Sequence, residues 1–299
     1  MISAAKYPPA VVPGDRVGVA ALSGAVDPER LERGLAALRE MGFEPVLADN
    51  LAARHGMFAG SDDERLDAFH RLAADPSLSA IFFARGGHGL LRVLPRIDWE
   101  LLADRPRAYV GYSDLTPFLL EVVSRLGWVA FHGPMVATDL ERGLDAEETA
   151  SLLGALRGEP VAPRLAGVVR SGRAEGVLIG GCLSLLTSVL GTAHQPDLRG
   201  TILFWEDVNE PPYRLDRMLT HLGLSGILEG VVGMAVGRCP HAAAAGDGEA
   251  WREVVRDSAA RVRGPVAWGL PSGHGSPNLT LPLGRAAVLD GETLRLQVR

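Results

Sequence analysis

The chain has 299 residues, of which 47% are apolar and 22% charged, a composition typical of a folded globular protein with one large or two smaller domains. Its formal net charge is −6 and its arginines are scattered, so no nucleic-acid partner is expected, because a phosphate-binding surface needs clustered positive charge. No apolar run reaches the roughly 18 residues of a membrane span, and no signal-peptide pattern opens the chain, so we expect a cytoplasmic protein without membrane contact.

The first half alternates short apolar runs with amphipathic stretches. The apolar runs predict strands at 17–22, 44–48, 79–84 and 108–112, and the helical spacing between them predicts helices at 28–41, 61–74, 89–94 and 115–126. Asp27 is placed to cap the first helix, and S-D-D-E from Ser61 fits a capping box for the second. This β-α-β-α order predicts an α/β fold with a parallel sheet covered on both faces.

A Pro- and Gly-rich stretch divides the chain after a predicted helix at 145–157. The stretch is G-E-P-V-A-P-R at 158–164, and we expect domains at 1–164 and 165–299. The second part predicts a smaller, mixed α/β domain, with strands at 168–169, 176–179, 201–205 and 231–236 and helices at 183–190, 212–222 and 249–262. Its end is strand-like with a hairpin turn at 290–291, and 241–248 is expected to be a mobile loop.

Ser113 lies where a predicted strand meets a predicted helix, in A-Y-V-G-Y-S-D-L-T. Such a turn projects a side chain over the carboxyl ends of parallel strands, where open α/β sheets bind ligands. The helix N-terminus also offers free N–H groups that can hold an oxyanion. Ser113 is therefore a candidate nucleophile, although Ser113 or Asp114 could equally cap the helix.

A serine nucleophile needs a base and a group that orients the base. His274, in P-S-G-H-G-S-P-N, has glycines on both sides that leave the imidazole uncrowded, and His88 and His132 compete on the same criterion. Glu206, followed by Asp207, ends the predicted strand T-I-L-F-W and could orient a histidine. A strand-end acid that caps the next turn is the alternative interpretation.

The turn R-G-G-H-G at 85–89 follows another predicted strand. It fits neither a dinucleotide fingerprint nor a Walker loop, and its glycines would let backbone N–H groups approach a ligand, as in an oxyanion hole. A plain tight turn is the alternative. Cys182 and Cys239 have no metal-binding spacing and no H-E-x-x-H is present, so we expect two reduced thiols, no metal and no cofactor.

Taken in order, the motifs resemble those of the LD-carboxypeptidases, a family of serine peptidases also called muramoyl-tetrapeptide carboxypeptidases. The matching segments are R-G-G-H-G (85–89), G-Y-S-D-L-T (111–116), F-H-G-P-M (131–135), G-V-L-I-G-G-C-L-S-L-L (176–186), G-T (191–192), I-L-F-W-E-D-V-N-E-P-P-Y-R-L-D-R-M-L (202–219) and G-H-G-S-P-N-L-T-L-P-L-G (273–284). Each motif is weak alone, whereas the ordered set spans most of the chain and is specific.

The resemblance implies a Ser–Glu–His triad at Ser113, Glu206 and His274, and an oxyanion hole from the backbone N–H groups of Gly86 and Asp114. It also implies an N-terminal domain of flavodoxin or glutamine-amidotransferase-like type, a C-terminal domain joined by a linker, and a homodimer. The family's usual reaction removes the terminal D-Ala of the murein tetrapeptide, at an L,D-amide bond and without a metal, in peptidoglycan recycling.

The chain departs from the family pattern at three positions. His88 stands where a tyrosine is commoner, Cys182 where an asparagine is commoner, and Trp205 where a leucine is commoner. These departures leave the triad intact and bear on substrate preference, so we take His88, Trp205 and Arg85 as candidate substrate contacts. Arg214 and Arg217 are further candidates for binding a substrate carboxylate.

The sequence leaves other functions open. A related branch resembles the microcin C immunity peptidases, which cleave an aminoacyl-nucleotide amide with the same triad. A non-catalytic small-molecule binding protein on the same cleft would bind a peptide or peptidyl ligand without turnover. A glutamine amidotransferase is disfavoured, because that class usually has a cysteine where Ser113 stands.

Overall fold

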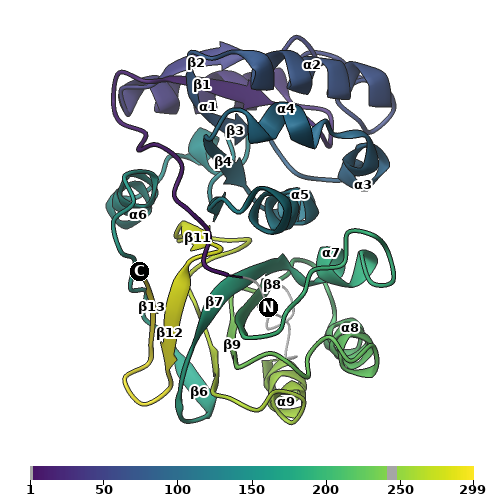
Figure 1. Ribbon diagram of the computed structural model, residues 1–299, viewed down its shortest axis with the longest axis vertical. Helices are drawn as coiled ribbons and strands as arrows, with labels where there is room; N and C mark the ends of the chain where they lie inside the picture. Colours follow the sequence, from purple (N-terminus) through teal and green to yellow (C-terminus); the bar gives the residue numbers. More distant parts are fainter. Residues whose placement is uncertain (1–2, 241–247) are drawn as a thin grey trace.

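The computed structural model describes residues 3–240 and 248–299, so most of the loop expected at 241–248 lies outside the described part. Two β-sheets form the frame of the molecule, one above the other in Figure 1, with helices packed against each. The expected α/β class is confirmed, with a mainly parallel N-terminal sheet and a mixed C-terminal sheet.

The first sheet has the strand order β11-β5-β4-β3-β1-β2. Its parallel strands are β1 (Arg16–Ala20), β2 (Glu44–Leu47), β3 (Leu78–Phe83), β4 (Ala108–Gly111) and β5 (Ala130–His132). The order 2-1-3-4-5 is that of flavodoxin-like sheets. Every residue of β4 is buried, as expected of a central strand with both faces covered. The sequence does not predict β5, because three residues are too few to show a periodicity.

The helices of the first half are α1 (Pro28–Glu40), α2 (Asp62–Ala74), α3 (Leu90–Val93), α4 (Trp99–Ala103), α5 (Thr116–Glu121) and α6 (Ala146–Leu156). The first two begin where their caps predict, and α4 was not predicted. The Asp27 side chain accepts hydrogen bonds from the first turn of α1, and the capping box predicted at Ser61 forms with Glu64. Helix α5 begins after a 3-10 turn at Ser113–Leu115 and continues into a π-helical turn that ends at Gly127.

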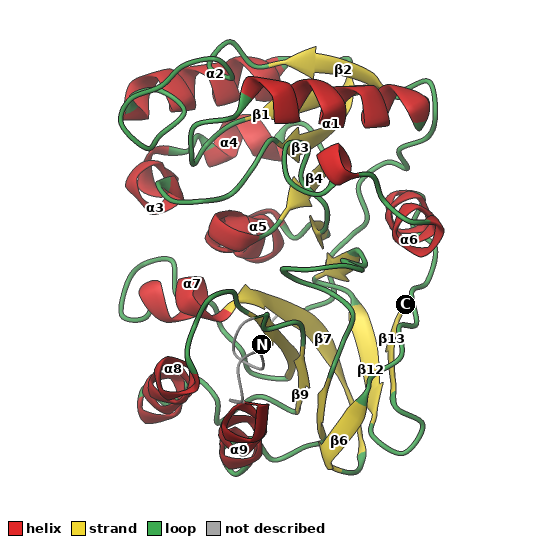
Figure 2. Ribbon diagram, turned by 180° about the vertical axis from the view of Figure 1, so that it is seen from behind, coloured by secondary structure: helices red, strands yellow, loops and turns green. Residues whose placement is uncertain are grey.

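The second sheet has the order β13-β12-β7-β8-β9-β10-β6. Figure 2 shows β12 between β13 and β7. Its strands are β6 (Gly167–Arg170), β7 (Arg173–Cys182), β8 (Thr201–Glu206), β9 (Gly233–Val236), β10 (Val266–Trp268), β12 (Ala286–Asp290) and β13 (Arg295–Val298). Strands β7 to β10 run parallel, and the others pair antiparallel. The helices are α7 (Leu183–Ser188), α8 (Pro212–Leu224) and α9 (Gly248–Ala259).

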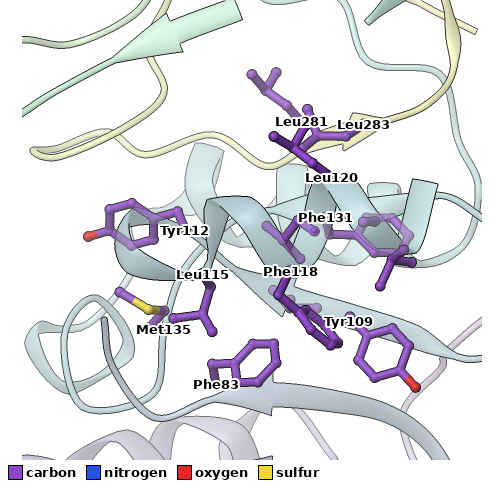
Figure 3. Packing of buried hydrophobic residues seen from close by; sticks show 14 of the residues in the cluster. Phe83, Tyr109, Tyr112, Leu115, Phe118, Leu120, Phe131, Met135, Leu281 and Leu283 are labelled. Atoms are coloured by element: carbon purple, nitrogen blue, oxygen red, sulfur yellow. The ribbon is translucent and has the colours of Figure 1, made fainter. Parts of the chain in front are cut away.

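One strand from the C-terminal part joins the first sheet. Strand β11 (Leu281–Leu283) pairs antiparallel with β5, and Leu281 lies opposite His132. Figure 3 shows Leu281 and Leu283 on the same side of the buried cluster as Leu120. This crossing brings the loop that precedes β11 to the junction between the two sheets.

Aromatic packing holds helix α5 against the first sheet. Phe118 is fully buried, with ring centroids 5.3 Å from Phe83 and 5.2 Å from Tyr109 (Figure 3). Its ring centroid also lies 5.6 Å from that of Trp99. Burying one such side chain contributes about 1.5–3 kcal/mol. The start of α5, and with it the preceding turn, is therefore held rigidly.

Candidate active site

Ser113 occupies a strained turn between β4 and α5. Its φ is 61°, in the left-handed region that few residues other than glycine adopt and that costs about 1–3 kcal/mol. The hydroxyl caps neither the 3-10 turn nor α5. Its Oγ lies instead 3.1 Å from Nε2 of His274. The strain serves to aim the side chain away from its own helix.

His274 reaches Ser113 from a glycine-flanked loop that connects β10 to β11. Gly273 and Gly275 both have positive φ, 108° and 132°, which side chains disfavour. A Cβ added at Gly273 would lie 2.6 Å from the Glu206 side chain, so only glycine fits there. The His274 ring also packs edge-on against Tyr112, with centroids 4.9 Å apart.

Glu206 ends β8 and is fully buried behind His274. Its Oε2 lies 2.6 Å from Nδ1 of His274 and accepts a 3.0 Å hydrogen bond from the backbone N–H of the same residue. Burial alone would raise the pKa of Glu206, but the charge and hydrogen bonds of His274 outweigh it and the pKa is lowered. Glu206 is therefore ionised, so Nδ1 carries the proton and Nε2 is free to accept one from Ser113.

The contact between Glu206 and His274 lowers the pKa of the carboxyl group and raises the pKa of the imidazole. Burial lowers this pKa, whereas the Glu206 carboxylate raises it by charge and by hydrogen bonding, and the net result is a raised pKa. The imidazole is thus a stronger base than a free histidine, as a group that takes a serine proton needs to be.

Gly86 lies directly beside the serine. A Cβ added at Gly86 would be 2.9 Å from Cβ and 3.0 Å from Oγ of Ser113, and 3.3 Å from the backbone nitrogen of Asp114. The Gly86 carbonyl accepts a 3.1 Å hydrogen bond from Gly24, which holds the peptide in place. For the part of the chain that the structure describes, no acceptor is present for the N–H groups of Gly86 and Asp114, so both are free to bind an oxygen.

Asp114 links the turn that carries Ser113 (the serine turn) to the glycine-rich turn at 85–89 (the glycine turn). Its side chain is buried and Oδ2 accepts a 2.9 Å hydrogen bond from the backbone N–H of Leu90, at the start of α3. The alternative that Asp114 caps its own helix is therefore wrong. The carboxylate instead fixes the spacing between the two turns that carry the free N–H groups.

The roles of His88, Arg85, Arg214 and Arg217 as substrate contacts stay predictions. His88 is exposed, with its ring 5.9 Å from Phe58, and Arg85 is half-buried and donates a 3.0 Å hydrogen bond to the Ala25 carbonyl. Arg214 pairs with Glu210, and Arg217 lies over the Tyr213 ring; both are on α8.

The interpretation of Trp205 as a pocket residue is wrong. Successive side chains of a strand point to opposite faces, so β8 directs Glu206 toward the junction and Trp205 away from it. Trp205 is 0% exposed and lies in the hydrophobic core. Cys182 is also buried, and its backbone N–H donates a 3.0 Å hydrogen bond to Thr116 Oγ1, which links β7 to the start of α5.

His132, the rival to His274, is a core residue. It is fully buried, and burial lowers its pKa to about 4, which keeps the imidazole neutral. Its ring lies 5.4 Å from Tyr112 and 4.9 Å from Phe204. Within residues 3–240 and 248–299, neither ring nitrogen has a hydrogen-bond partner.

Sequence reasoning missed the polar residues that anchor the site. Asn278 Oδ1 accepts a 2.9 Å hydrogen bond from Gly273, and its backbone N–H donates a 2.7 Å bond to the buried Glu148 of α6. The Tyr112 hydroxyl donates to Asp139 at 3.3 Å. Asn278 stands in the G-H-G-S-P-N motif, but nothing distinguished it from a surface asparagine before the tertiary contacts were known.

The described residues contain no group of three or more His, Cys, Asp or Glu side chains placed to hold a metal ion. No helix among them is long and apolar enough to cross a membrane. Both cysteines are free and buried.

Serine hydrolases on several unrelated folds share the same arrangement, in which a serine faces a histidine backed by a buried carboxylate. The site and the fold together define a protein of that class. The chain belongs to the LD-carboxypeptidase family: models of the family's N-terminal and C-terminal domains match residues 17–133 and 175–289. The resemblance inferred from the motifs is thus confirmed, and the protein is a peptidase. The boundary predicted near residue 165 falls between the two matched regions and stays a prediction.

Bacterial relatives are similar to this chain over nearly their whole length. The chain is 36% identical to the probable murein peptide carboxypeptidase of Bacillus subtilis, covering 95% of this chain and 91% of the relative. It is 35% identical to the murein tetrapeptide carboxypeptidase of Pseudomonas aeruginosa, covering 94% of each.

Solved structures show the same fold. The muramoyltetrapeptide carboxypeptidase from Oxalobacter formigenes superposes with a TM-score of 0.86 at 31% identity, over 95% of this chain and 97% of that one. An MccF-like protein from Bacillus anthracis gives a TM-score of 0.90 at 23% identity, over 98% and 99% of the two chains. MccF in complex with glutamyl sulfamoyl guanosine gives a TM-score of 0.86 at 23% identity, over 97% of each chain.

Proposed function

We propose that this peptidase is a metal-independent serine carboxypeptidase that hydrolyses an L,D-amide bond and releases the terminal D-Ala of the murein tetrapeptide in peptidoglycan recycling. The continuous contact from Ser113 through His274 to Glu206, at 3.1 Å and 2.6 Å, is the observation that carries the proposal. The names of the relatives from Bacillus subtilis and Pseudomonas aeruginosa support the murein substrate.

The reaction begins at the Ser113 hydroxyl. Its Oγ attacks the amide carbonyl carbon while Nε2 of His274 takes the proton, and the buried Glu206 carboxylate stabilises the imidazolium that forms. The C–N bond then breaks, and His274 returns the proton to the leaving amine of D-Ala. Water releases the acyl group from Ser113 by the same route.

The carbonyl oxygen becomes negative at the tetrahedral stage and needs donors that are already in place. Gly86 lies beside Ser113 and Asp114 follows it in the chain, and their free N–H groups would supply these donors. A donor of this kind is worth about 10²–10³ in kcat. The hydrogen bond from Leu90 to the Asp114 side chain keeps the two turns at the required separation.

Ser113→Ala tests the nucleophile. Wild-type protein treated with a chelator should release D-Ala from murein tetrapeptide, and Ser113→Ala should lower kcat by about 10⁴ or more at an unchanged melting temperature. A fluorophosphonate should label the wild-type serine only. Near-normal turnover by Ser113→Ala would refute the assignment.

The same assay separates the alternatives. Cleavage of an aminoacyl sulfamoyl adenosine without cleavage of the tetrapeptide would move the protein to the microcin C immunity branch. Binding without turnover or labelling would make it a small-molecule binding protein. We also propose a cytoplasmic homodimer of two-domain chains divided near residue 165, which light scattering and limited proteolysis would test.

A further inference from the structure

A cavity of about 510 Å³ borders His274 on the side of the second sheet. It lies beyond the carboxyl ends of β9 and β10, and the crevice outside the carboxyl ends of parallel strands is where α/β sheets usually bind ligands. Its wall includes Arg238, Trp251, Trp268 and Gly275. It therefore combines a cation with large apolar surfaces next to the imidazole.

Arg238 is held at this wall by the loop that carries His274. It follows β9, its backbone N–H donates to the Ser272 carbonyl at 3.0 Å, and its Nε donates to the Pro277 carbonyl at 2.9 Å. A Cβ added at Gly275 would lie 3.1 Å from Arg238 Cδ, so the arginine side chain crosses directly over that glycine. The guanidinium is thus fixed beside the residue that follows His274.

In the part of the chain that the structure describes, the charge of Arg238 has no ion-pair partner. The side chain is half-buried, yet no carboxylate among residues 3–240 and 248–299 lies within ion-pair distance of it. Burial lowers the pKa of Arg238 because it removes water from the cation, and the charge of Glu148, which forms no ion pair with it, opposes this shift only in part. Arg252, in the same cavity, differs because it has Glu249 as a partner at 3.6 Å. A partly desolvated guanidinium without a carboxylate is suited to an incoming anion.

The reaction mechanism indicates which part of the substrate binds in this cavity. In a serine peptidase the histidine gives its proton to the leaving amine, so the leaving group must lie on the histidine side of the scissile bond. His274 lines the cavity that holds Arg238. The leaving amino acid has its carboxylate one carbon beyond that amine, close enough to reach a neighbouring guanidinium.

We propose that Arg238 is the specificity-determining residue that binds the anionic group of the leaving portion of the substrate. This inference rests on the proposed function, since it needs Ser113 and His274 in their stated roles. The group is an oxyanion, either the terminal carboxylate of a peptide or the phosphoryl group of an aminoacyl nucleotide. The guanidinium can bind both with two parallel hydrogen bonds.

Binding to Ser113→Ala tests the inference without turnover. Calorimetry would compare the tetrapeptide ending in D-Ala carboxylate with the same peptide as its C-terminal amide. The Ser113→Ala protein should prefer the acid by about 10–100-fold, and adding Arg238→Gln should remove this preference, because a hydrogen bond to a charged group contributes about 1.5–3 kcal/mol. Arg256→Gln, an exposed arginine that pairs with Glu249 on α9, is the matched control and should leave the preference unchanged.

The kinetic arm uses otherwise wild-type protein. Arg238→Gln should raise KM for the acid about 10–100-fold with a much smaller change in kcat, and Arg238→Lys should recover part of the loss. If an aminoacyl phosphoramidate of adenosine is affected and the peptide acid is not, the anion is the phosphoryl group. An acid preference that survives Arg238→Gln would overturn the inference. So would equal affinity of Ser113→Ala for acid and amide together with an Arg238→Gln protein whose KM for the aminoacyl phosphoramidate is unchanged. Absence of any turnover or Ser113 labelling in wild-type protein would instead overturn the proposed function.

Discussion

Replacing Gly86 by alanine would place a methyl group beside the Ser113 hydroxyl. The added carbon would lie 2.9 Å from Ser113 Cβ and 3.0 Å from Oγ, whereas carbon atoms in contact normally lie about 3.5–4.0 Å apart. The methyl would also lie 3.3 Å from the Asp114 nitrogen, in the space where the substrate oxygen approaches. Either the serine turn or the glycine turn must therefore move by about 0.5–1 Å.

Such a movement should act on the transition state more than on folding. A misplacement of about 1 Å can lower a rate about 10²-fold, and loss of one oxyanion donor lowers kcat by about 10²–10³. We therefore expect kcat to fall about 10²–10³-fold, which corresponds to about 2.7–4 kcal/mol of transition-state stabilisation. The overpacking should lower the free energy of unfolding by about 1–3 kcal/mol.

Steady-state kinetics with murein tetrapeptide and thermal unfolding measure the two effects separately. Gly154→Ala is the control: Gly154 lies in α6, and the nearest neighbour of its added Cβ is a Glu159 carboxylate oxygen at 3.0 Å on a flexible side chain. That variant should keep full activity. A Gly86→Ala protein with kcat within about threefold of wild type would refute the oxyanion role of Gly86.

Two further predictions follow from the pKa of His274 and from the burial of Trp205. The proposed mechanism uses neutral His274 as the base, and its pKa is raised, so kcat/KM should fall as pH decreases through a value above 6.5. In Glu206→Gln the carboxylate charge that raises the pKa of His274 is lost, and burial then lowers this pKa. The fall of kcat/KM on the acid side should therefore move to lower pH, and the plateau value should drop about 10⁴-fold. An acid-side fall at an unchanged pH would contradict the role of Glu206. Trp205→Phe should lower stability by about 1–2 kcal/mol and leave KM unchanged, and a raised KM would show that Trp205 contacts substrate after all.

The sequence by itself determined the local structure and the family. Apolar periodicity predicted the alternating strands and helices of the first half, and Asp27 and Ser61 marked two helix starts because capping depends only on neighbouring residues. Ser113 could be placed at a strand-to-helix turn because the strand before it and the helix after it also show in the local sequence. The ordered motifs were enough to identify the LD-carboxypeptidase family, although none showed that Ser113, Glu206 and His274 lie close together in space.

Only the tertiary structure decided which residues face one another. Ser113 and His274 are 161 positions apart, and they meet because β11 crosses to the first sheet and brings the His274 loop to the junction. The alternation of side chains along β8 places Glu206 at the site, as predicted, and buries Trp205 in the core, because the sequence does not say which face of a strand is directed toward the site. Arg238 became a candidate in the same way: its cavity and its lack of a carboxylate partner among the described residues depend on long-range packing, which no local pattern encodes.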